Sequence, residues 1–116
     1  MMNMTNLQRL LLEIKGIDLD QNELAVYLQE NDLNPHDEYI PSSATNKRNI
    51  YKTALSILES IANNVQLMKN YKHDDMTVTD FHENLLNRID QLERKIRSMK
   101  TDEQEQTGNV FMLFNS

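Results

Sequence analysis

The sequence predicts a small all-α protein, a four-helix bundle, and three observations favour this fold class. Only two glycines and two prolines occur in 116 residues, too few for a chain built mainly from tight turns. Four stretches carry apolar side chains at the three- and four-residue spacing of an amphipathic helix. The chain is 39% hydrophobic and 26% charged, a balance typical of a globular domain rather than a disordered one. We expect one helical bundle domain at residues 1–100.

The first helix is predicted from "TNLQRLLLEIKG" at 5–16. Thr5 and Gln8 stand at the spacing of a capping box, and Gly16 suits the position that follows a helix. The expected apolar stripe is Leu7, Leu10, Leu11 and Ile14.

The second helix is predicted from "DQNELAVYLQEN" at 20–31. Asp20 is expected to cap it, and Leu24, Tyr27 and Leu28 supply the buried face. The same stretch carries a superficial calcium-loop pattern, but Glu23 replaces the required glycine, so helix capping explains the acids better.

The third and fourth helices are predicted from 46–64 and 80–100, where the apolar spacing is most regular. The fourth has a heptad-like pattern that is too short for an independent coiled coil, so it should pack against the third. Between them, Met76 and Val78 alternate with threonines, which predicts an extended crossing, and Thr77 or Thr79 is expected to cap the fourth helix. The expected bundle core is Leu10, Ile14, Leu24, Ile50, Ala54, Leu58, Ile61, Leu85, Ile89, Leu92 and Ile96.

Two segments are expected to lie outside the helices. The first is a long loop at 32–46, marked by Pro35 and Pro41; loops of this length are often functional. The second is an arm at 101–116, a polar linker followed by five apolar residues. We expect these five to dock on a partner: Val110, Phe111, Met112, Leu113 and Phe114. The alternative is that Phe111 and Phe114 fold back onto the chain's own helices.

The residue types exclude several kinds of chemistry. There is no cysteine, so thiolate metal sites, disulfides and cysteine nucleophiles are ruled out. The three histidines share no metal-ligand spacing, and no phosphate-binding loop or nucleophile elbow occurs. We therefore expect no enzyme activity, no cofactor and no metal.

The charge of −6 is unevenly distributed along the chain. Residues 1–46 carry eight acids and two bases. No basic patch with interleaved aromatic residues occurs, so tight nucleic-acid binding is not expected. Arg9, Glu13 and Lys15 interrupt the first apolar run, and no stretch approaches the roughly 20 apolar residues of a membrane span. We expect a soluble protein made inside the cell, without membrane contact.

The third and fourth helices resemble the helical half of tailed-phage head–tail connector proteins, also called adaptor or head-completion proteins. The resemblance covers residues 47–99, through "NIYKTALSILESIANNVQLMKNY", the break "MTVTD" and "FHENLLNRIDQLERKIRSM". The positions that carry it are Ala54, Leu58, Ile61, Ala62, Leu67, Thr77, Val78, Leu85, Arg88, Leu92 and Ile96. The first helix and the "GIDLDQNE" turn do not match the family's N-terminal helix.

The resemblance implies a structural virion protein of the phage neck, located at the head–tail interface and assembled in the bacterial cytoplasm. Such proteins form homo-oligomeric rings, typically of twelve copies, between the portal and the next neck, stopper or tail protein. The C-terminal arm would dock on the portal, and DNA would pass through the channel without specific binding. The expected channel-facing acids are Asp18, Asp20, Asp37 and Glu38, since acidic walls repel the phosphate backbone.

A second hypothesis remains open on the same residues. A small acidic helical regulator or anti-defence protein could bind and mask a host protein with its acidic half. Stoichiometry separates the two: a connector joins a cyclic oligomer or a portal, whereas a masking protein is monomeric or dimeric on its target.

Overall fold

The computed structural model describes residues 3–15, 17–64 and 77–99, and within them every regular element is an α-helix. The helices are α1 (Asn6–Glu13), α2 (Gln21–Glu30), α3 (Ala44–Ala62) and α5 (Val78–Ser98). The predicted all-α, four-helix fold is therefore confirmed for this part of the chain. The predicted arm at 101–116, with Val110 to Phe114, lies outside the described residues, as do Gly16, Leu67 and Met76.

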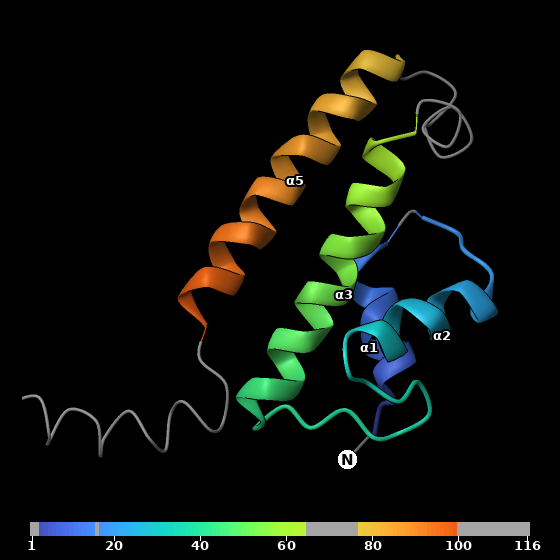
Figure 1. The fold of residues 1–116 in the computed structure, drawn as a ribbon, viewed down its shortest axis with the longest axis vertical. Coiled ribbons are helices and arrows are strands. Elements are labelled where there is room, and N and C mark those ends of the chain that lie inside the picture. The colour runs from blue at the N-terminus through green and yellow to red at the C-terminus, as the bar shows by residue number, and fades with distance from the viewer. Residues whose placement is uncertain (1–2, 16, 65–76, 100–116) are drawn as a thin grey trace, which may run out of the picture.

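Helix α3 lies at the centre of the bundle. Among the described helices its backbone packs against all three others, whereas the backbone of α5 packs against α3 and reaches α1 through side chains. Figure 1 shows α3 and α5 side by side and antiparallel, with the shorter helices α1 and α2 also against α3. The predicted packing of the fourth helix on the third is confirmed, and the bundle is a long helix pair with a shorter pair on one side.

Local capping explains where most of these helices begin. The Thr5 hydroxyl accepts a hydrogen bond from the Gln8 N–H and the Gln8 side chain bonds back, which completes the predicted capping box of α1. The hydroxyl of Ser43 caps α3 and that of Thr77 caps α5. The prediction for α2 was wrong in one respect, because the Asp20 side chain makes no capping hydrogen bond.

Two element boundaries differ from the sequence prediction. Because Ser43 is the cap, α3 begins at Ala44, inside the predicted 32–46 loop, and the irregular segment ends at 43. Because Thr77 is the cap, Val78 is the first residue of α5 rather than part of an extended crossing. In both places a side-chain hydroxyl accepts a hydrogen bond from the backbone N–H three residues later, and this cap sets the start of the helix.

Helix α2 ends in a Schellman motif without a glycine. Asp32 has φ 63°, and its N–H donates to the Gln29 carbonyl at 3.2 Å. The N–H of Leu33 donates to the Leu28 carbonyl at 2.9 Å. Leu33 is buried with Leu28, the apolar contact that accompanies this motif. The motif turns the chain back toward α1, where the loop is fixed.

The core is formed by the inward faces of all four helices. All eleven residues expected in it are buried, and Leu28, Leu33, Tyr39, Tyr51 and Ile57 join them. Two members of the predicted α1 stripe do not, since Leu7 is only partly buried and Leu11 is 44% exposed. Helix α1 buries only Asn6 and Leu10, because it lies at the side of the bundle.

Candidate functional site: anchored loop, charged cluster and α2–α3 cleft

The segment between α2 and α3 is anchored to the start of α1. The first N–H groups of a helix have no partner within the helix, and here loop carbonyls accept from them. The N–H of Asn6 donates to the Asp37 carbonyl at 2.9 Å, and that of Leu7 donates to the Pro35 carbonyl at 3.1 Å. The loop therefore has a fixed position on the bundle although it contains no regular structure.

A chain of buried asparagines adds to this anchoring. The Asn46 side-chain amide donates to Asn6 Oδ1 at 2.9 Å, and Asn6 Nδ2 donates to the Asn34 carbonyl at 2.9 Å. Asn46 Oδ1 in turn accepts from the N–H of Ile40 at 2.8 Å. The side chains of Asn6 and Asn46 are buried. The hydrogen bonds they make join α1, the loop and α3 in one network.

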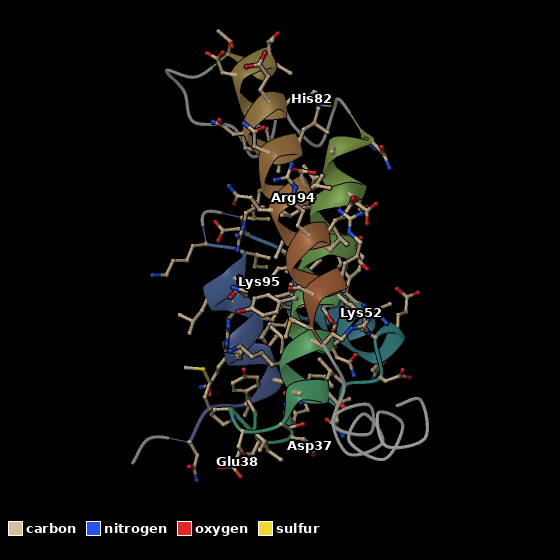
Figure 2. All side chains as sticks on the ribbon, turned by 90° about the vertical axis from the view of Figure 1, so that its left-hand side faces the viewer. Asp37, Glu38, Lys52, His82, Arg94 and Lys95 are labelled. Atoms are coloured by element: carbon tan, nitrogen blue, oxygen red, sulfur yellow. The ribbon has the colours of Figure 1, made fainter. Side chains whose placement is uncertain are left out.

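The four acids expected to face a channel form two pairs. Asp37 and Glu38 are exposed on the loop beside Thr5, at the N-terminal end of α1, and Figure 2 shows both at one end of the bundle. Asp18 and Asp20 are exposed beyond the C-terminal end of α1. The two pairs therefore flank opposite ends of α1, whose eight residues span about 12 Å.

A cluster of charged residues joins α1 to α5. Glu13 accepts from Arg9 at 2.8 Å and from Arg88 at 2.6 Å. The Glu13 side chain is 13% exposed, so this carboxylate bridges two cations with little water around it. Burial of Arg9 opposes its charge, but the hydrogen bond and charge of Glu13, followed by Tyr39, raise the pKa of Arg9 above its ordinary value. Arg9 therefore remains a cation.

Two tyrosines complete this cluster. The Arg9 guanidinium lies 5.4 Å from the ring centre of Tyr39 and 5.7 Å from that of Tyr51. Lys95 Nζ lies 4.5 Å from the ring centre of Tyr51, and Figure 2 shows Lys95 on the side of α5 that faces α1. These are cation–π distances. The cluster holds α1, the loop, α3 and α5 in register, and its cations are occupied by internal partners.

A cleft of about 450 Å³ lies between α2 and α3. Helix α2 lines it with four residues at i, i+3, i+4 and i+7: Glu23, Val26, Tyr27 and Glu30. Helix α3 and the segment before α2 supply the rest: Ile57, Ser60, Ile61 and Leu19. Apolar side chains therefore form the centre of the cleft, and a carboxylate stands toward each end of its α2 wall.

Sequence reasoning missed both the charged cluster and the cleft. The i, i+4 spacing of Arg9 and Glu13 was a local signal for one ion pair, but nothing in the sequence indicated Arg88, 75 residues away. The cleft also had a local signal. Besides Leu24 and Leu28, which face the core, α2 carries two more apolar residues, Val26 and Tyr27, and these line the cleft.

The fold and the site together define the class of protein: a small all-α bundle with an anchored acidic loop and a cleft that has a glutamate toward each end. The chain matches no family model, no curated protein and no solved structure in the comparisons made. No helix within 3–15, 17–64 and 77–99 has the length and apolar character to cross a bilayer. The same ranges contain no group of three or more His, Asp or Glu residues placed to hold a metal ion.

Proposed function

We propose that the protein is a structural component of a tailed-phage neck, a ring adaptor between the portal and the tail-side neck proteins. The observation that carries the proposal is the anchored loop. Hydrogen bonds to α1 and α3 fix its backbone while Asp37 and Glu38 remain exposed. An assembly surface benefits from such preorganisation, because the ordering entropy is lost on folding and not again on association. The antiparallel α3–α5 pair contains most of the positions that resemble connector proteins.

The two acid pairs suit a channel wall. In a ring of copies, the pair Asp37 and Glu38 and the pair Asp18 and Asp20 would each form a separate belt of negative charge. Because the pairs flank opposite ends of α1, the belts would be displaced from each other along the channel if α1 ran along it. Like charge repels the phosphate backbone, so DNA would slide past without binding.

The C-terminal arm supplies the proposed contact with the portal. Burying four or five of the apolar side chains at 110–114 gains about 6–15 kcal/mol. Ordering some nine residues costs about 9–18 kcal/mol. One arm alone would therefore bind weakly. Added backbone hydrogen bonds at the edge of a partner sheet, repeated around a ring, would make the contact stable.

Deletion of residues 108–116 tests this assignment. Helicity and melting temperature should remain almost unchanged, whereas incorporation into connector assemblies should be lost. The matched control replaces the polar stretch 102–107 by a Gly/Ser linker of equal length, which should still be incorporated. A large drop in melting temperature on deletion would place the arm in the core and contradict a docking role.

The second candidate, an acidic module that masks a host protein, is favoured by one observation, the cleft flanked by Glu23 and Glu30. Sedimentation of the full chain with extract from its host separates the two candidates. A closed ring, or a complex with a portal, supports the adaptor. A monomer or dimer bound to one host protein supports the masking module.

A further inference from the structure

We infer that the α2–α3 cleft is a docking site for a cationic amphipathic segment of a partner protein, with two or three apolar side chains between basic ones. This inference goes beyond the adaptor proposal and does not depend on it. It stands on the apolar lining of the cleft, on the placement of its two glutamates and on the charge of the residues around it.

The apolar part of the cleft is incompletely covered by the chain itself. Ile57 and Ile61 form a buried floor, whereas Val26 on the α2 wall is 52% exposed. Tyr27 and Leu19 are half-buried beside it. An apolar side chain entering the cleft would remove the exposed part of Val26 from water while contacting an already rigid floor, so little reorganisation is needed.

The chain segments that line the cleft carry acids and no lysine or arginine. Residues 16–46, which include α2 and both segments that flank it, contain seven acids and no lysine or arginine. On α3 the residue beside Ser60 is Glu59, and residues 53–64 contain no base. Glu23 and Glu30 are exposed and form no ion pair within the described part of the chain. The potential over the cleft therefore favours a cationic partner and disfavours an acidic one.

The spacing of the two glutamates indicates the form of that partner. Seven residues of helix place Glu23 and Glu30 about 10 Å apart along α2, with Val26 and Tyr27 between them. A partner helix with bases at i and i+7 and apolar residues at i+3 and i+4 has the same spacing. The chain's own arm is a poor occupant, because the linker before it carries Asp102, Glu103 and Glu105.

The test is titration of the full-length protein with a synthetic helical peptide of 14 residues. The peptide carries lysines at i and i+7 and leucines at i+3 and i+4, and calorimetry measures Kd while amide chemical shifts locate the site. We expect a Kd below about 100 μM at low salt, with shifts at α2 and at 57–61 of α3. A matched peptide with glutamate for lysine should not bind.

Two variants and two matched controls decide whether the cleft is responsible. E23Q/E30Q should weaken binding about 2- to 30-fold, whereas D37N/E38Q, which removes two exposed acids elsewhere, should leave it unchanged. V26S should weaken it about three- to tenfold, whereas L86S, at a similarly exposed leucine on α5, should not.

Several results would overturn the inference. These are no binding, equal effects of E23Q/E30Q and D37N/E38Q, or shifts located away from α2. Concentration-dependent self-association lost in E23Q/E30Q would make a second copy the occupant. The chain has a basic segment of its own at 65–72, which carries Lys69 and Lys72. Tighter peptide binding after K69A/K72A would indicate that this segment competes for the cleft, and would contradict a site reserved for a partner.

Discussion

Replacing Asn46 by alanine should destabilise the protein strongly, because the residue joins the loop to two helices. Its side chain donates to Asn6 Oδ1 at 2.9 Å and accepts from the Ile40 N–H at 2.8 Å. Losing two such bonds costs about 1–3 kcal/mol, and leaving the buried Asn6 oxygen without its donor adds about 1–3 kcal/mol. The expected loss of about 2–6 kcal/mol is a large fraction of the roughly 5–15 kcal/mol by which a typical domain is stable.

Urea unfolding followed by circular dichroism at 222 nm measures this change. Asn87→Ala, on the exposed face of α5, is the matched control and should change stability by less than about 0.5 kcal/mol. The double variant N6A/N46A should lose about 1–3 kcal/mol less stability than the sum of the two single variants. The reason is that it also removes Asn6 Oδ1, which Asn46→Ala alone leaves buried without a donor. A loss below about 0.5 kcal/mol for Asn46→Ala, or strict additivity, would refute the network as the anchor of the loop.

Three further predictions concern the Glu13 ion pairs, the C-terminal end of α2 at Asp32 and the Thr77 cap of α5, and urea unfolding measures the stability change in each case. Glu13→Gln should lower stability by about 1–3 kcal/mol because two cations lose their carboxylate. Asp90→Asn removes the exposed ion pair with Arg94 and should change stability by less than about 1 kcal/mol; equal effects of the two variants would contradict the bridging role of Glu13. Asp32→Gly should raise stability by about 0.5–1 kcal/mol because glycine accepts the positive φ without strain, and a loss would count against the Schellman geometry. Thr77→Ala should cost about 1 kcal/mol by removing the cap of α5, and no change would show that the cap is dispensable.

Local signals in the sequence were enough for most of the helices. The Thr5–Gln8 capping box and the spacing from Leu85 to Ile96 depend on residues within one or two turns, where geometry follows from the helix itself. The same reasoning failed at Asp20, since a carboxylate at the right position need not adopt the capping conformation. It failed at Leu11 because how much of a helix is buried depends on its neighbours.

The candidate site was less predictable because its parts are distant in sequence. Asn6 and Asn46 are 40 residues apart, and polar side chains carry no periodic signal of the kind that reveals a core. The cleft depends on where α2 lies against α3, which the helical pattern of α2 alone does not determine. The four acids were identifiable as exposed, but their separation into two pairs follows from the anchoring of the loop.

The proposed role as a ring adaptor is tested most directly by electron microscopy of the native assembly purified from infected cells through the full-length chain. The proposal predicts a closed ring of copies, with the C-terminal arms on a portal and Asp37 and Glu38 toward the channel. A single copy or a dimer on a host protein, with the α2–α3 cleft occupied and no ring, would contradict it.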